Sequence, residues 1–169
     1  MIQNALQFTT QLLNQYIKNK FRLHDDVVIC NAIVNADNST ERVNQNKVVV
    51  SFINLELDKS IRNTVHPANA PNIQPVSNRY NLDVLVASNF DSYDESLKFL
   101  DAVITFFHTH PVIDSNTRPN MPDTIEQMSF EMEKLGYQET DSLWNALNAI
   151  YRPSVIYKLR LVSINTDEI

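Results

Sequence analysis

Glycine is nearly absent from this chain, and its scarcity excludes several common active-site architectures. The 169 residues contain one glycine, Gly136. Phosphate-binding loops, dinucleotide-binding turns and the strained turns that carry a catalytic serine need glycines for positive φ angles or close backbone approach. Most nucleotide-dependent chemistry is therefore excluded. Asparagine supplies left-handed turn residues instead, and we expect it to do so at Asn35 to Asn38 and Asn44 to Asn46.

Cysteine, positive charge and long apolar runs are also scarce. The lone Cys30 lies in a β-like stretch, where it is interpreted as a small buried hydrophobic residue rather than a reactive thiol. A formal net charge of −6 opposes attraction to nucleic acid and to anionic membranes, so neither is an expected partner. The apolar runs are far shorter than the ~20 residues that span a bilayer. Residues 1–21 lack the features of a secretory signal, which favours synthesis and residence in the cytoplasm.

The composition and the periodicity of apolar residues predict one α+β domain over residues 1–169. Hydrophobic residues make up 43% of the chain and charged residues 20%, which is ordinary for a globular protein. The expected architecture is a largely antiparallel or mixed sheet flanked by about three helices. Helical spacing over residues 1–21 and 92–110, with Ser92 and Glu95 as a capping pair, predicts two of these helices.

A third helix is expected from a cap at Thr140 or Asp141, through Ile150, to a stop at Pro153. Alternating apolar residues predict strands, of which the first two form a hairpin. The expected strands cover residues 26–34, 47–57, 79–87, 112–114, 125–132 and 154–164.

The segment from Asp58 to Asn78 shows no periodicity and is expected to be a long extended loop. Its prolines, Pro67, Pro71 and Pro75, recur every four residues, and proline fixes φ and removes a backbone donor. Loops of this length are usually functional or disordered. We therefore interpret the three prolines as part of an extended arm that reaches a neighbouring subunit or another part of an assembly, with a passive surface loop as the alternative.

The strongest candidate for a metal site consists of His108, His110 and Asp114. Two imidazoles and a carboxylate could bind zinc or iron in a small hydrolase. The two histidines straddle a predicted helix end, however, where the helix dipole favours cationic side chains. The acidic pairs and the serines show no supporting nucleophile and base pattern. We therefore expect no enzyme activity, catalytic residue, cofactor or metal.

Two further segments are candidate interfaces. Tyr151 and Arg152 follow a helix that contains Trp144. Trp, Tyr and Arg are enriched at interface hot spots, but the residues alone favour a core position for Trp144 followed by a helix stop. In the last strand, Lys158 and Arg160 alternate with apolar residues and define a charged face. That strand could lie at a sheet edge and add to another chain, or lie centrally and be fully paired.

Several segments, in order along nearly the whole chain, resemble the N-terminal domain of cap proteins from extracellular contractile injection systems. The most specific are the helix of residues 92–107, which ends in two phenylalanines, and the Trp-containing helix that leads into Tyr151-Arg152-Pro153-Ser154 and Tyr157-Lys158. The other segments are VVVSFINLEL at 48–57 and RYNLDVLVAS at 79–88. These cap proteins are related to phage tail terminators.

The resemblance implies a structural subunit that forms a homohexameric ring at the baseplate-distal end of the tube. Its expected partners are further copies of itself, the inner-tube protein and the sheath protein, and its final location is the assembled particle, within or outside the cell. Many caps extend beyond the last strand, whereas this sequence ends at Ile169, so contact with the sheath is less certain than contact with the tube. A completion or connector protein of the same assembly is the alternative.

Overall fold

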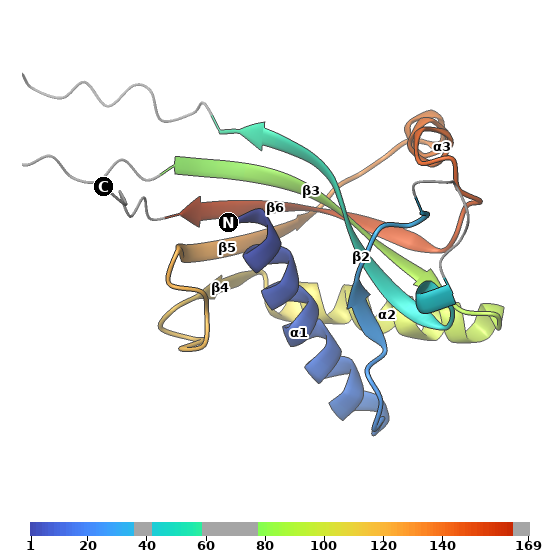
Figure 1. Ribbon diagram of the computed structural model, residues 1–169, viewed down its shortest axis with the longest axis horizontal. Helices are drawn as coiled ribbons and strands as arrows, with labels where there is room; N and C mark the ends of the chain where they lie inside the picture. The colour runs from blue at the N-terminus through green and yellow to red at the C-terminus, as the bar shows by residue number, and fades with distance from the viewer. Residues whose placement is uncertain (36–41, 59–77, 164–169) are drawn as a thin grey trace, which may run out of the picture.

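The computed structural model describes residues 1–35, 42–58 and 78–163, which fold as an α+β domain (Figure 1). Its helices and strands, in chain order, are α1 (Ile2–Phe21), β1 (Val28–Cys30), the short 3-10 helix η1 (Arg42–Asn44), β2 (Lys47–Leu57), β3 (Asn78–Asn89), α2 (Tyr93–Thr109), β4 (Val112–Asp114), β5 (Ile125–Met132), α3 (Tyr137–Ala146) and β6 (Ser154–Ser163). This agrees with the predicted fold class. The prolines of the predicted arm, Pro67, Pro71 and Pro75, lie outside the described residues.

The strands form one mixed, six-stranded sheet in the order β1-β2-β3-β6-β5-β4. All neighbouring pairs are antiparallel except β1 and β2, which run parallel with Val28 opposite Val48. The predicted hairpin between the first two strands is therefore wrong. β1 ends at Cys30 rather than at residue 34, so the chain has room to return before β2 begins, as a parallel pair requires.

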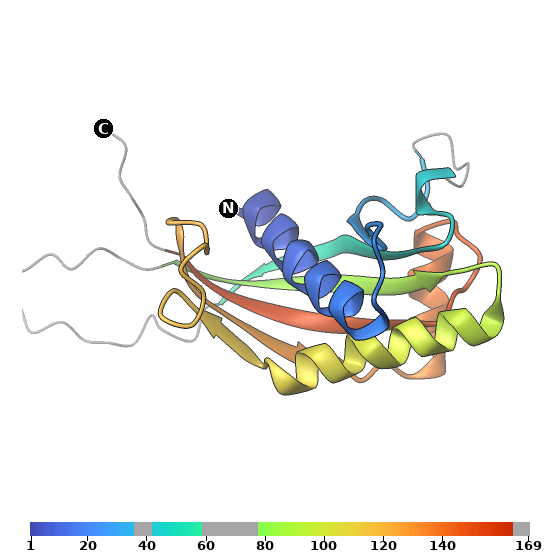
Figure 2. The same cartoon turned by 90° about the horizontal axis from the view of Figure 1, so that it is seen from below.

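Helices cover both faces of the sheet (Figures 1 and 2). α1 and α2 lie on one face, called the inner face below, and α3 lies on the other, the outer face. The period-two alternation of the strands assigns their residues to these faces: Leu82, Tyr157 and Leu159 belong to the inner core, while Leu85 packs with Trp144 on the outer side. The inner core is the larger of the two.

Aromatic residues join the two inner helices to each other and to the sheet. The ring centroids of Tyr16 and Phe106 are 5.4 Å apart, and those of Phe21 and Phe99 are 5.2 Å apart. Phe107 reaches the sheet, where its ring lies 4.2 Å from that of Tyr157. Such pairs add roughly 0.5–1.5 kcal/mol each beyond the burial of their area.

The predicted start of α2 is confirmed. Ser92 is its N-cap, and its hydroxyl accepts a hydrogen bond from the backbone N–H of Glu95 at 3.4 Å. The left-handed turn predicted at Asn44 to Asn46 is also present, with Asn46 at φ 55°.

The predicted limits of α3 are wrong at both ends. Its N-cap is Gly136, whose backbone N–H donates to Glu139 Oε2 at 2.7 Å, so the helix begins before Thr140. It ends at Ala146 because Asn148 adopts a left-handed conformation, φ 50°, well before Pro153. Ile150 therefore lies beyond the helix. No helix in the described ranges is both long and apolar enough to cross a membrane.

Candidate functional site

His108, His110 and Asp114 do not form the metal site considered from the sequence. His108 is exposed in the last turn of α2, while His110 Nδ1 lies 3.0 Å from the carbonyl of Phe106. Asp114 instead accepts hydrogen bonds from Thr117, which lower the pKa of its carboxyl. Across residues 1–35, 42–58 and 78–163, no three His, Cys, Asp or Glu side chains lie together in a way that could hold a metal.

The last strand is central, not an edge. β6 pairs with β3 along its whole length and with β5 from Tyr157 to Ser163. Its backbone groups are therefore occupied, and the proposed addition of another chain to this strand is wrong. The predicted alternation is confirmed, because Tyr157, Leu159 and Leu161 are buried in the inner core, which places Lys158 and Arg160 on the outer face.

The charged side chains on the outer face pair across strands. Arg160 Nη2 lies 2.8 Å from Glu131 Oε2 on β5, and this pairing lowers the pKa of Glu131. Lys158 Nζ lies 3.5 Å from Glu133 Oε1 and 3.7 Å from Glu56 Oε2. Their side chains are between 22% and 63% exposed, and ion pairs that water reaches to this extent contribute little to stability.

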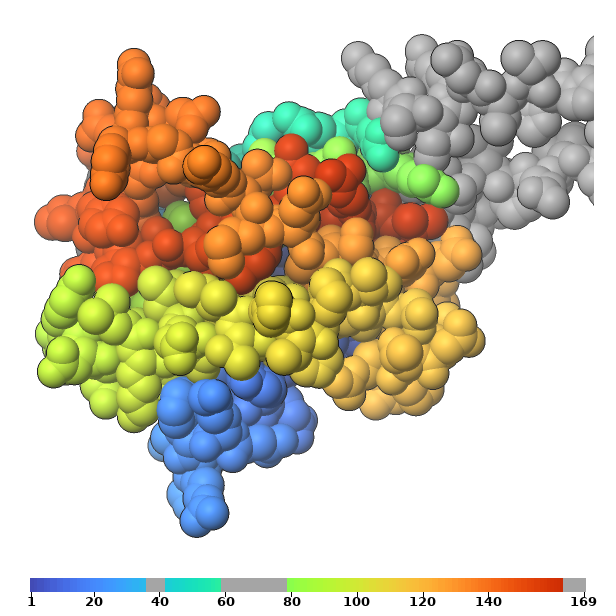
Figure 3. All heavy atoms as spheres, turned by 180° about the vertical axis from the view of Figure 1, so that it is seen from behind, coloured from blue at the N-terminus to red at the C-terminus, as the bar shows by residue number. Residues whose placement is uncertain are grey.

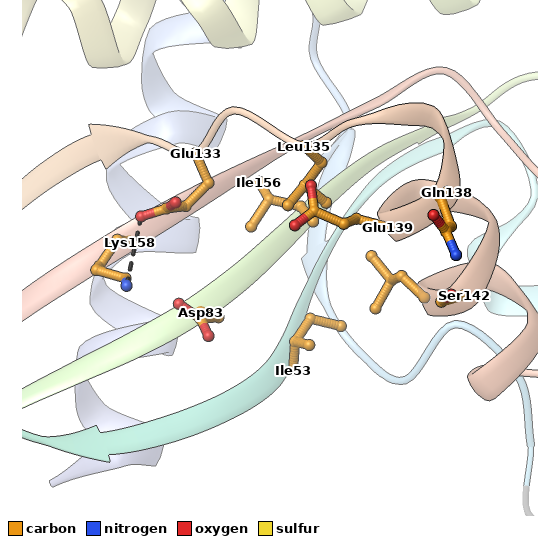
Figure 4. A pocket seen from close by; sticks show the side chains of 10 residues that line it. Ile53, Asp83, Glu133, Leu135, Gln138, Glu139, Ser142, Ile156 and Lys158 are labelled. Carbon is orange, nitrogen blue, oxygen red and sulfur yellow. Dashed lines mark ion pairs between the residues drawn. The ribbon is translucent and has the colours of Figure 1, made fainter.

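A cavity of about 580 Å³ opens between α3 and the outer face, next to Lys158 (Figure 4). Its apolar lining comes from Ile53 on β2, Ile156 on β6 and Leu143 on α3. Its charged lining consists of the carboxylates of Asp83, Glu133 and Glu139 together with the ammonium of Lys158. The volume is within the usual range of ligand pockets, roughly 300–1,000 Å³.

Asp83 contributes to this cavity a carboxylate oxygen that is buried and has no hydrogen-bond donor in the described part of the chain. It lies opposite Lys158 in the sheet register. Burial raises the pKa of its carboxyl, although the nearby positive charge of Lys158 and a hydrogen bond from the Asn54 side chain oppose this effect. Its Oδ1 atom is buried and has no hydrogen-bond partner in the described part of the chain. Such a group is rare in native structures and indicates a missing donor.

The second candidate segment, Tyr151 and Arg152, lies just after the opposite end of α3. Trp144 is only 4% exposed and belongs to the outer core, so its core interpretation is confirmed. The Tyr151 ring packs edge-on against it at 5.5 Å but remains 58% exposed. Ile150 is 84% exposed, and Arg152 is exposed without an ion pair to any described residue. In Figure 3 the orange spheres of α3 stand out from the body of the molecule.

Sequence reasoning identified Arg152 and Lys158 but missed the acidic partners in the cavity. The signal for Asp83 was available, because it alternates with Leu82 and Val84 and must face outward. Glu139 was harder to identify from the sequence. It lies three residues after the cap Gly136, as in a capping box, but glycine has no side chain and so does not match the usual sequence pattern of that motif.

No curated protein matches the chain. Its fold is similar to that of a chain in the cryo-EM structure of the sheath/tube terminator, in its extended state, of PVC, an extracellular contractile injection system. The TM-score is 0.51 at 14% sequence identity, over 92% of this chain and 57% of the other.

The chain thus spans little more than half the length of that terminator, and at this identity the likeness shows a shared fold. The family comparison reaches further, because the model of the Pvc16 N-terminal domain matches residues 5–169. This match includes every strand, α2, α3 and most of α1. The chain therefore belongs to the Pvc16 N-terminal domain family.

Proposed function

We propose that this chain is a terminator subunit that closes the baseplate-distal end of the tube and sheath in a contractile injection system. The observation that carries the proposal is the family match over residues 5–169. The shared fold with a sheath/tube terminator supports it independently. The role is structural: Lys158 and Arg160 form ion pairs with Glu56, Glu133 and Glu131 rather than standing beside a nucleophile as its base.

The terminator acts as a homohexameric ring placed on the last layer of inner-tube protein and against the sheath protein. A ring requires two different, complementary surfaces on each subunit, since head-to-tail contacts either close or continue as a filament. We place the subunit in the cytoplasm at synthesis and on the particle after assembly, including particles released from the cell. Neither nucleic acid nor a membrane is a partner in this proposal.

Deleting the gene in a producing strain tests this role. A tube grows by repeated addition of identical subunits, so removing its terminator leaves growth without a stop. We expect particles of irregular length, or tubes that have lost their sheath, and restoration of normal particles by the wild-type gene. Particles of normal length and intact sheath in the deletion strain would contradict the proposal.

The alternative, a completion or connector protein of the same assembly, predicts a different position. Immunogold labelling of particles would place a connector at the baseplate end or at an internal joint. Labelling restricted to the end distal to the baseplate supports the terminator.

A further inference from the structure

We propose that the cavity beside α3 receives the segment Ile150–Arg152 of a neighbouring copy of this chain, with the Arg152 guanidinium among the cavity carboxylates. This inference rests on the proposed ring and identifies the contact that joins its subunits. The occupant is a second copy because one chain carries both a cavity rich in carboxylates and an exposed arginine without an ion pair.

The charge of the cavity favours a cationic side chain. Three carboxylates and one ammonium line it, so its lining has an excess of negative charge. Lys158 is already shared between Glu133 and Glu56, which leaves Asp83 without a close ion-pair partner among the described residues. The buried Oδ1 atom of Asp83 lacks a donor. A guanidinium carries five N–H donors in a plane and suits this oxygen.

The apolar part of the cavity matches the rest of the segment. Ile53, Ile156 and Leu143 form an apolar surface beside the carboxylates. An arginine lays its aliphatic stem along such a surface while its charged end reaches the carboxylates. Ile150 precedes Arg152 by two residues and is 84% exposed, so burying it against a neighbour would remove apolar area from water.

The two surfaces can operate at the same time on every subunit. On α3 the cavity is lined by Gln138, Glu139, Ser142 and Leu143. The segment Ile150–Arg152 follows the other end of this ten-residue helix, which is ~15 Å long. Tyr151 packs against Trp144 and lines a hollow beside the cavity, but neither Ile150 nor Arg152 lines the cavity itself, so these two side chains remain available to a neighbour. Each copy can donate its arginine to one neighbour and accept that of another, which is the head-to-tail arrangement that closes a ring.

Disulfide cross-linking in assembled particles tests this contact. The background variant is Cys30→Ser, because the predicted burial of Cys30 is wrong: its side chain is exposed and would form disulfides of its own under oxidation. Adding Ser142→Cys in the cavity and Ile150→Cys in the segment leaves Arg152 in place. After mild oxidation we expect a ladder of cross-linked oligomers on a non-reducing gel. Either cysteine alone should give no ladder, and neither should Ser142→Cys combined with Arg118→Cys.

Charge reversal then tests the arginine. In the two-cysteine protein, Arg152→Glu should lower the cross-linked fraction about tenfold or more, since it removes one partner of a desolvated charge pair and adds repulsion. The matched control Arg118→Glu makes the same charge change on the exposed β4–β5 connection and should leave the ladder intact. If Arg152→Glu reduces the amount of folded protein, Arg152→Ala provides the same comparison without repulsion.

The outcomes separate this inference from the proposed function. Particles that carry the subunit at their end but give no ladder, or a ladder that Arg152→Glu and Arg152→Ala do not reduce, would overturn the inference and leave the terminator role standing. Particles that lack the subunit altogether would overturn both.

Discussion

The buried hydroxyl of Tyr157 lowers the stability of the folded protein. The side chain is buried at the centre of the sheet against Phe107, and its hydroxyl oxygen has no hydrogen-bond partner in the described residues. Removing a buried, unpaired polar atom while keeping the ring relieves a desolvation penalty. We expect Tyr157→Phe to leave stability unchanged or to raise it by about 1 kcal/mol, as measured by urea denaturation. A loss above about 1 kcal/mol would show that the hydroxyl has a partner.

The same hydroxyl predicts a loss of stability at alkaline pH. Burial raises the pKa of Tyr157 from its ordinary value of 10.0 to about 12 in the folded protein. Between about pH 10 and 12 the unfolded chain loses this proton while the folded chain keeps it, so the free energy of unfolding falls as pH rises. Tyr157→Phe should lose less stability over this window. Identical pH profiles for the two proteins would contradict the assignment.

Asn44 holds the segment between β1 and β2 in place. It is only 1% exposed, and its Nδ2 donates to the carbonyl of Ala32 at 2.8 Å while its Oδ1 accepts from Asn31 Nδ2 at 2.9 Å. Asn44→Ala would leave these buried groups unsatisfied, at a cost of about 2–3 kcal/mol in urea denaturation. The exposed Asn145→Ala is the control and should change stability by less than about 0.5 kcal/mol. Equal effects of the two changes would contradict this role of Asn44.

Among the elements, α3 forms one wall of the cavity, and its start depends on a cap without a side chain. A Cβ added to Gly136 would lie 3.6 Å from Glu139 Oε2, an ordinary contact, and its φ of −74° suits any residue. A serine there can cap the helix with its hydroxyl, whereas an alanine cannot. We expect Gly136→Ser to be more stable than Gly136→Ala by about 0.5–1 kcal/mol in thermal unfolding. A less stable serine variant would contradict this description of the cap.

Elements whose signals are local were predictable from the sequence. The alternation of residues 154–163 and the capping pair of Ser92 and Glu95 are properties of neighbouring residues, and both are present in the structure. The parallel pairing of β1 with β2 was not predictable, because it depends on where a three-residue strand ends. The central position of β6 was equally open, since sequence spacing does not fix strand order.

The cavity could not be predicted from the sequence either. It joins Ile53 on β2, Asp83 on β3, Ile156 and Lys158 on β6 and four residues of α3 between Gln138 and Leu143. These residues are far apart in the chain, and they meet only because β6 lies between β3 and β5. The sequence identified single residues such as Lys158 as exposed and charged. It could not identify which residues lie next to them in space.

At the scale of the whole molecule, the outer face combines a paired charge network with a cavity, and we assign this face to contacts between subunits. Arg160 pairs with Glu131 through side chains that are both exposed. Arg160→Glu should therefore leave the fold intact, with unchanged circular dichroism, but lower the amount of the subunit retained on purified particles, as measured by quantitative mass spectrometry. Full retention of the Arg160→Glu subunit on particles would show that this part of the sheet is not the contact surface.

The central claim, that this chain is a terminator, is tested most directly by a cryo-EM reconstruction of intact particles. The account predicts density that fits this fold, with its six-stranded sheet, in a ring at the end of the tube distal to the baseplate. The same density along the tube, at the baseplate end, or nowhere on particles with complete ends would contradict it.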